Sequence, residues 1–210
     1  MIIDKEKLIF IHIPKNAGTS IKSIFSENKN FHIPGGEIFK HKTINEIKKE
    51  HLDKYNEYKK FAIIRNPYDR MISFYAYYKN YRLTNNMLYK KGYVEKANIK
   101  NFREWICNKK ENVDINYSIK YHVGKLNVLN TFIKEKLFKP QHTWVDKTVA
   151  ILKFENLQKD FNDFLNKKVN IPKTNNSSRY DLLDYYNEET ANIVYNLYKE
   201  DFKKFNYKKL

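Results

Sequence analysis

Two short segments of the sequence combine cationic, hydroxyl and small residues in a way that suits phosphate binding. The first reads Ile-His-Ile-Pro-Lys-Asn-Ala-Gly-Thr-Ser over residues 11–20. An apolar run precedes it and a helical pattern follows, so backbone N–H groups and a helix N-terminus are expected to face an anion. Lys15 adds positive charge, and Thr19 and Ser20 add hydroxyl donors. We interpret the segment as a phosphate-binding loop; the alternative is an ordinary turn with a solvated lysine.

This loop differs from the phosphate-binding loop of common ATPases and GTPases. In those enzymes the lysine follows the second glycine and directly precedes a serine or threonine. Here Lys15 comes before Gly18. The spacing therefore disfavours a standard ATPase or GTPase.

The second segment reads Phe-Ala-Ile-Ile-Arg-Asn-Pro-Tyr-Asp-Arg-Met-Ile-Ser over residues 61–73. Arg65 follows an apolar run, and Ser73 lies about two turns farther along a predicted helix. Arginine can hold a phosphate through two parallel hydrogen bonds, and a nearby serine can share the same group. The segment predicts a second phosphate contact; the alternative is a structural ion-pair cluster of Arg65, Asp69 and Arg70.

Three parts of the chain share one plan, in which an apolar run leads through a turn into a helical pattern. The runs cover residues 8–13, 61–64 and 149–154. This alternation predicts an α/β fold with a P-loop-like parallel sheet flanked by helices. Because ligands bind at the carboxyl ends of such strands, the site is expected just after Ile13, Ile64 and Phe154.

The rest of the chain gives weaker signals. Residues 79–145 have poor periodicity and many Tyr, Lys and Asn residues, with a short helix expected near 102–106, so we interpret them as an inserted, helical or irregular region that faces the substrate. A final helix is predicted from residue 188 to about 203, with Asn187 as its N-cap. No repeat or low-complexity linker divides the chain, and we expect residues 1–210 to form one domain.

Composition limits the class of protein. With 41% hydrophobic and 16% aromatic residues the chain is expected to fold, and no run approaches the roughly 20 apolar residues of a membrane-spanning helix. The single Cys107 and the absence of a secretory signal pattern favour the cytoplasm. The net charge of +16 suggests an anionic partner, although a lysine-rich coding bias explains the excess equally well.

The two phosphate motifs together resemble the carbohydrate sulfotransferases that use 3′-phosphoadenosine 5′-phosphosulfate (PAPS), especially the heparan sulfate 2-O and 6-O group. In that family a loop similar to residues 14–20 binds the 5′-phosphosulfate, and a segment similar to residues 65–73 binds the 3′-phosphate. Asn16 and Ala17 replace the family's usual threonine and glycine. We expect no counterpart of the anchor and stem of the animal enzymes, which would suit a bacterial or viral member. The likeness continues through residues 138–144, 152–157, 175–179 and 201–207.

The resemblance implies an enzyme that moves a sulfuryl group from PAPS to a hydroxyl acceptor, expected to be a glycan, with 3′-phosphoadenosine 5′-phosphate (PAP) as product and no metal. Catalysis would use Lys15, against charge on the leaving phosphate, and His41, placed as the family places its base; Glu46 and Glu50 are weaker candidates for the base. Residues that would contact the acceptor are His32, Gln141, His142 and Trp144. Those that would bind PAPS are Lys15, Asn16, Ala17, Gly18, Thr19, Ser20, Arg65, Ser73 and Arg179.

Two other functions compete with this one. The charge and the aromatic insertion also suit a noncatalytic protein that binds a polyanion or nucleic acid, but such a protein leaves both phosphate motifs unexplained. A P-loop-like kinase shares the architecture but needs magnesium, and the sequence shows no obvious aspartate pair to bind that ion. We therefore expect no nucleic-acid partner. The acceptor and the oligomeric state are left open by the sequence.

Overall fold

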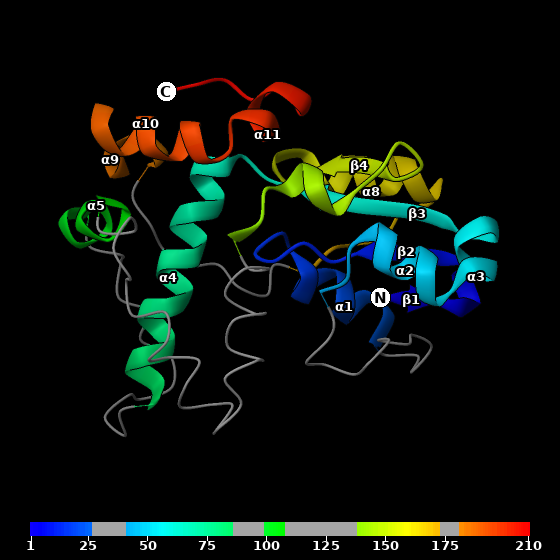
Figure 1. Cartoon of the computed structure of the whole chain (residues 1–210). Helices are drawn as coiled ribbons and strands as arrows, with labels where there is room; N and C mark the ends of the chain where they lie inside the picture. Colours follow the sequence, from blue (N-terminus) through cyan, green and yellow to red (C-terminus); the bar gives the residue numbers. More distant parts are fainter. Residues whose placement is uncertain (27–40, 86–98, 108–137, 173–180) are drawn as a thin grey trace, which may run out of the picture. The chain divides into compact units, whose positions relative to one another are not determined.

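The computed structural model describes residues 1–26, 41–85, 99–107, 138–172 and 181–210 (Figure 1). The chain forms two compact units, residues 1–66 with 140–175 and residues 67–139 with 176–210. Most of the predicted insertion, residues 79–145, lies outside the described part of the chain.

The first unit is built on a sheet whose strands follow the order β1-β2-β3-β4 among the described residues. Strands β2 and β3 are parallel, as are β3 and β4, whereas β1 pairs antiparallel with β2. The predicted α/β class and its three parallel strands are confirmed. The short β1 was not predicted, because two residues show no periodicity. The bounds are β1 Ile2–Ile3, β2 Leu8–Ile11, β3 Lys59–Ile64 and β4 Ala150–Lys153.

Side chains on one face of this sheet form an aromatic core with α1 (Gly18–Ser26) and α8 (Leu157–Leu165). The ring of Phe61 lies 4.9 Å from that of Phe10 and 5.6 Å from that of Phe161, between centroids. Both faces of β2 and of the last four residues of β3 are buried, which explains their continuous apolar runs. The residues that alternate to the other face are each 0% exposed: Ile9, Ile11, Ala62 and Ile64.

Two short helices, α2 (Ile44–Glu50) and α3 (Leu52–Glu57), precede β3. Helix α2 begins at a capping box, in which Thr43 and Glu46 satisfy each other's backbone N–H groups. The hydroxyl of Tyr55 on α3 donates to Asp146 at 3.0 Å. Asp146 follows the 3₁₀-helix η4 (Gln141–Trp144), so this bond ties α3 to the segment that leads into β4. Two further 3₁₀-helices are η1 (Asp4–Glu6) and η5 (Phe154–Asn156).

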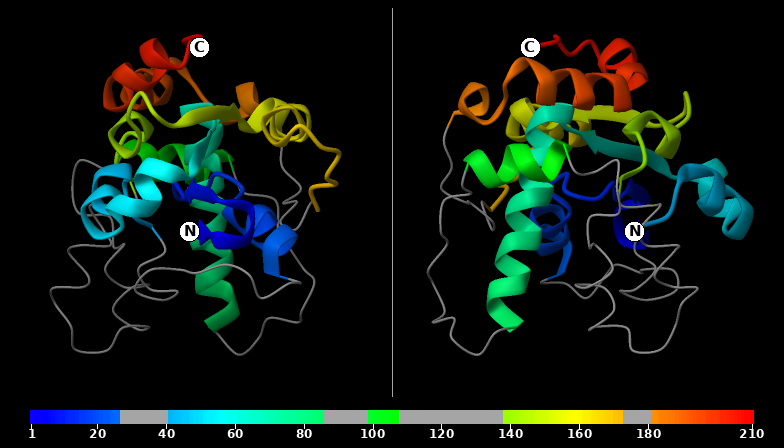
Figure 2. Two further views of the ribbon diagram at one scale, coloured as in Figure 1. Left: turned by 90° about the vertical axis from the view of Figure 1, so that its right-hand side faces the viewer. Right: turned by 60° about the vertical axis from the view of Figure 1, so that its left-hand side comes forward.

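The second unit is helical in its described residues. Helices α5 and α10 lie beside the first half of α4 in the views of Figures 1 and 2, and their shared core is rich in aromatic rings. Although α4 has 19 residues, no helix in the described part is long and apolar enough to cross a membrane. The helices are α4 Pro67–Asn85, α5 Ile99–Cys107, α9 Leu182–Tyr185, α10 Glu188–Leu197 and α11 Lys199–Lys204.

The predicted C-terminal helix is divided at Tyr198. Its start is as predicted, since the Asn187 side chain accepts a hydrogen bond from Thr190 N at 3.0 Å. At Tyr198 the backbone has φ −120° and ψ 23°, outside the helical region. The buried Tyr198 hydroxyl donates to the carbonyl oxygen of Phe138 at 3.1 Å. The break therefore accompanies a contact 60 residues away in sequence, which helical periodicity does not encode.

Alkaline pH should destabilise the protein through Tyr198. Burial, partly opposed by Arg70, raises the pKa of its hydroxyl from 10.0 to about 12. The folded chain thus holds this proton more tightly than the unfolded chain, so the stabilisation is present below pH 10 and is lost as the pH rises toward 12. We expect the free energy of unfolding to fall by about 1 kcal/mol between pH 10 and 11 because of this hydroxyl.

Urea unfolding of the wild type and of Tyr198→Phe near pH 8, 10 and 11 measures this effect. The variant keeps the ring but has no proton to lose, so its free energy of unfolding should fall less steeply above pH 10. Equal slopes in the two proteins would contradict the assignment.

Candidate functional site

The ends of three parallel strands meet at Arg65, which follows β3 and is 6% exposed. Its guanidinium donates to the carbonyl oxygen of Lys15 at 3.1 Å and lies over the ring of Phe154, 4.1 Å from the centroid. Lys15 comes from the loop after β2, and Phe154 comes directly after β4. The strand ends that the sequence predicted as a site are therefore brought together. The sequence did not predict that Phe154 contacts Arg65, although it did predict that Phe154 lies at the end of a strand near the site.

The loop after β2 has an unusual backbone. Lys15 and Ala17 have positive φ angles of 68° and 55°, while Asn16 between them does not. Such alternation turns successive N–H groups toward one side and forms a concave anion-binding nest. A left-handed non-glycine residue costs on the order of 1 kcal/mol or more, and such strain persists only where the surroundings fix the backbone. The loop geometry thus suits an anion.

The N-terminus of α1 adds to this nest. The first helical bond runs from Ile21 N to Ala17 O at 3.1 Å, so the N–H groups of residues 18–20 have no acceptor inside the helix. These N–H groups and the positive end of the helix dipole favour a bound anion. Residues 12–20 contain no carboxylate, and they add the Lys15 ammonium and the hydroxyls of Thr19 and Ser20. This donor set fits a phosphate or sulfate group.

Gly18 at the start of α1 is required by a close approach. A Cβ atom at this position would lie 1.6 Å from Nε2 of His12. The His12 ring therefore rests directly on the loop, and it also stacks on Phe10 at 5.5 Å between centroids. His12 is therefore a packed residue that supports the loop.

Two buried amides join the loop to the end of β3. Asn16 and Gln141 are each 0% exposed. The Asn16 side chain donates to Ile63 O at 2.7 Å and to Gln141 Oε1 at 2.6 Å. Gln141 in turn accepts from Arg65 N at 2.9 Å and donates to Arg65 O at 2.8 Å. No local signal could have revealed this arrangement, because Asn16 and Gln141 are 125 residues apart.

His41 is oriented by a backbone group of the same loop region. Its Nδ1 lies 2.8 Å from the carbonyl oxygen of His12. A carbonyl oxygen only accepts, so Nδ1 carries the hydrogen and Nε2 of the neutral ring keeps its lone pair. The His41 ring lies 4.4 Å from the His12 ring and 6.5 Å from the buried indole of Trp144, between centroids. The nitrogen that can act as a base is thus Nε2.

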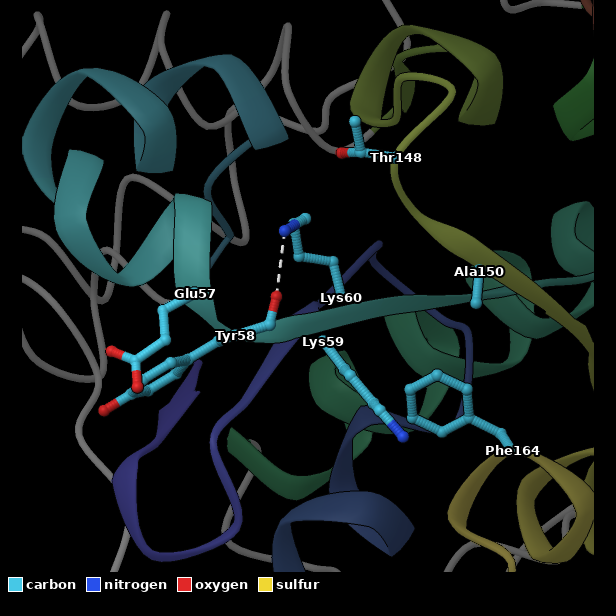
Figure 3. Close-up of a pocket in the computed structure, with 7 residues that line it drawn as sticks. All are labelled: Glu57, Tyr58, Lys59, Lys60, Thr148, Ala150 and Phe164. Carbon is cyan, nitrogen blue, oxygen red and sulfur yellow. Dashed lines mark hydrogen bonds between the residues drawn. The ribbon is translucent and has the colours of Figure 1, made fainter.

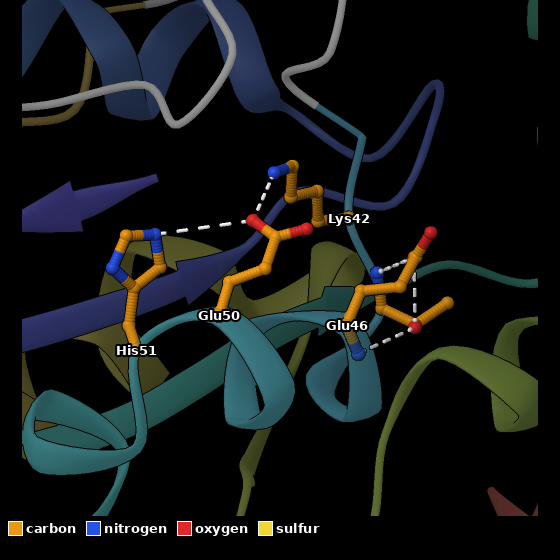
Figure 4. Close-up of polar contacts among 5 residues, drawn as sticks. Lys42, Glu46, Glu50 and His51 are labelled. Atoms are coloured by element: carbon orange, nitrogen blue, oxygen red, sulfur yellow. Dashed lines mark hydrogen bonds and ion pairs between the residues drawn. The ribbon is translucent and has the colours of Figure 1, made fainter.

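The two carboxylates considered as alternative bases have other partners (Figure 4). Glu46 accepts from the backbone N and the hydroxyl of Thr43, at 2.7 and 2.9 Å. Glu50 forms an ion pair with Lys42 and lies 3.9 Å from Nε2 of His51. These contacts stabilise the ends of α2, and they leave His41 as the stronger candidate.

The remaining predicted residues are placed as follows. Ser73 is half-buried on α4 in the second unit, and His142 is half-buried on η4 in the first. His32 and Arg179 lie outside the described residues. In the described ranges, no group of three or more His, Cys, Asp or Glu side chains could hold a metal ion.

A shallow pocket lies at the opposite ends of the strands, where β3 and β4 begin (Figure 3). Within it, the Lys60 ammonium donates to the carbonyl oxygens of Tyr55 at 2.5 Å and Tyr58 at 2.8 Å. These bonds hold the turn between α3 and β3, so this lysine serves the fold. The lining residues are Glu57, Tyr58, Lys59, Lys60, Thr148, Ala150 and Phe164.

The contact of Gly18 with His12 can be measured through stability. Gly18→Ala forces a methyl group into the imidazole and should lower the free energy of unfolding by about 2 kcal/mol. In a His12→Ala background the same substitution should cost clearly less, because the ring is absent. Urea unfolding of the wild type, the two single variants and the double variant gives the coupling free energy between Gly18 and His12. An equal cost of Gly18→Ala in both backgrounds would refute the contact.

Comparison with known protein families identifies the family of the chain. The chain matches the Sulfotransferase family over residues 1–208. This range includes both phosphate motifs and all the residues of the site described above. No curated protein and no solved structure matches the chain.

Proposed function

The chain belongs to the sulfotransferase family, which implies transfer of a sulfuryl group from PAPS, and from this premise we propose a carbohydrate hydroxyl as acceptor and His41 as the base. The observation that carries the proposal is the convergence of the 15–20 loop, Arg65 and the oriented His41 in one unit. When bound, PAPS supplies an activated sulfuryl group whose leaving group is a phosphate. The membership in an enzyme family disfavours a noncatalytic polyanion-binding protein.

The residues that would hold PAPS are the donors already described. The nest and the N-terminus of α1 would bind the 5′-phosphosulfate, with Lys15 as the charged side chain. Arg65 would bind the 3′-phosphate, and the family resemblance adds Ser73 and Arg179 as candidates for that group. The Arg65 guanidinium has five N–H donors, so it can bind a phosphate while Nη1 stays bonded to the Lys15 carbonyl oxygen.

Lys15 would stabilise the charge that develops as the sulfur–oxygen bond to the phosphate breaks. Stabilisation by a fixed positive charge of this kind is worth about 3 kcal/mol in a site shielded from water. Because the negative charge grows during the reaction, Lys15 would contribute more to turnover than to affinity.

His41 would remove the proton of the acceptor hydroxyl. A sugar hydroxyl is a weak nucleophile, so its proton must leave as the new oxygen–sulfur bond forms. Nε2 of His41 takes this proton, while the hydrogen bond from Nδ1 to His12 O holds the ring in place. The same carbonyl oxygen stabilises the imidazolium that results.

The preference for a carbohydrate rests on the resemblance of the motifs to the carbohydrate sulfotransferases and on the net charge of +16, which suits an acidic glycan. His32 and His142 are the candidates for acceptor contacts. Trp144 is 0% exposed, so it would act by packing against His41.

PAP should bind the wild type without magnesium, and more tightly than ATP does. Arg65→Ala should raise the PAP dissociation constant by about ten- to a hundredfold, because a charge-assisted contact to phosphate is lost. Isothermal titration calorimetry measures both effects. Lys59→Ala, which removes an exposed positive charge from the other end of β3, is the matched control and should leave binding unchanged. Tighter binding of ATP with magnesium than of PAP would refute the proposed donor.

His41→Ala should lower turnover by about a hundredfold or more, while the dissociation constant of PAP stays within about threefold of the wild type. The reason is that a base acts in the transition state and does not hold the donor. Transfer of radiolabelled sulfate from PAPS to unsulfated glycans such as heparosan and chondroitin measures turnover. His51→Ala is the control histidine on α2. Undiminished transfer by His41→Ala would exclude this residue as the base.

A further inference from the structure

Gln141 lies where three segments of the first unit meet, and its buried amide group uses both of its polar atoms. Oε1 accepts two hydrogen bonds, from Arg65 N and from the Asn16 side chain. Nε2 donates to Arg65 O. A side chain with 0% exposure and these three bonds is in place to organise its neighbours.

The pair of bonds to Arg65 replaces strand pairing at a point where the strand has ended. The last paired residue of β3 is Ile64, opposite Lys153. Gln141 then binds both the N–H and the carbonyl oxygen of Arg65, as a neighbouring strand would. The backbone from which the guanidinium extends is therefore fixed, although it lies beyond the sheet.

The bond to Asn16 fixes the nest in the same way. Asn16 stands between the two left-handed residues Lys15 and Ala17. Its Nδ2 is held by Ile63 O at 2.7 Å and by Gln141 Oε1 at 2.6 Å. A single oxygen atom of Gln141 thus connects the loop to the backbone of Arg65. Any shift of one group requires a shift of the other.

We propose that Gln141 is the positioning residue for the donor, and that it holds the nest and Arg65 in one arrangement so that a 3′,5′-bisphosphorylated nucleotide is bound at both ends at once. The inference rests on the proposed function and replaces the expected acceptor contact of Gln141 with a role in donor binding. Preorganisation of both contacts lowers the ordering cost of binding.

If Gln141 has this role, PAP should bind more tightly than a nucleotide with one phosphate, and this difference in affinity should depend on Gln141. In the wild type, the ratio of the dissociation constant of adenosine 5′-phosphate to that of PAP measures what the 3′-phosphate contributes. Gln141→Met keeps the length of the side chain but removes all three hydrogen bonds. We expect the ratio to fall by about tenfold or more, since the Arg65 backbone loses both of its hydrogen bonds to Gln141 and the guanidinium is no longer held for the 3′-phosphate.

A second variant separates the two halves of the arrangement. Asn16→Ala breaks the link to the nest but leaves Gln141 paired with Arg65, so both nucleotides should bind more weakly and the ratio should stay near that of the wild type. Arg65→Ala should lower the ratio in the wild-type background and have little further effect in the Gln141→Met background.

Two controls exclude a general loss of stability. Thr143→Ala changes an exposed residue of the same 3₁₀-helix, and Phe161→Leu destabilises the core of the first unit without touching these residues. Calorimetric titration of the full-length proteins, with thermal unfolding as the check on folding, should show unchanged ratios for both controls.

An unchanged ratio in folded Gln141→Met would overturn the inference, as would an equal fall in Phe161→Leu. If Gln141→Met does not fold, a fall of the ratio in Asn16→Ala overturns it. Failure of the wild type itself to bind PAP would overturn the proposed function and this inference with it, and is thus distinct from a failure confined to the variants.

Discussion

Parallel pairing of β2 with β3 and of β3 with β4 is the constraint on which the site depends. Because parallel strands run in one direction, their carboxyl ends lie at the same edge of the sheet. Lys15, Arg65 and Phe154 are far apart in sequence, yet each follows one of these strands, and the guanidinium of Arg65 contacts the other two residues. The parallel pairing thereby brings the loop after β2 and the residues after β3 and β4 into contact.

The same edge creates a problem of unpaired backbone groups, because the ladder of hydrogen bonds stops where the strands end. Buried N–H and carbonyl groups must find other partners, at a cost of about 1 to 3 kcal/mol for each one left alone. Asn16 and Gln141 supply these partners at Ile63 and Arg65. Amide side chains suit this position, since each offers both a donor and an acceptor without a charge.

His12 connects the loop that follows β2 to the candidate base. Its ring rests on Gly18, and its carbonyl oxygen accepts the hydrogen bond that orients His41. A change in the loop backbone would therefore reach His41 through this one residue. Such preorganisation is what transfer of a charged group requires, because the dipoles need not reorient during the reaction.

The sequence by itself determined the three parallel strands, the helices that follow them and the Asn187 cap, because each depends on local periodicity or on neighbouring residue types. Only the tertiary structure decided the short β1, the break at Tyr198, the tautomer of His41 and the burial of the Gln141 amide between Asn16 and Arg65. The strand β1 is too short to show periodicity, and the other three depend on partners distant in sequence: Asn16 and Gln141 are 125 residues apart, and His12 and His41 are 29 apart. Local patterns carry no information about which distant groups will meet once the chain is folded.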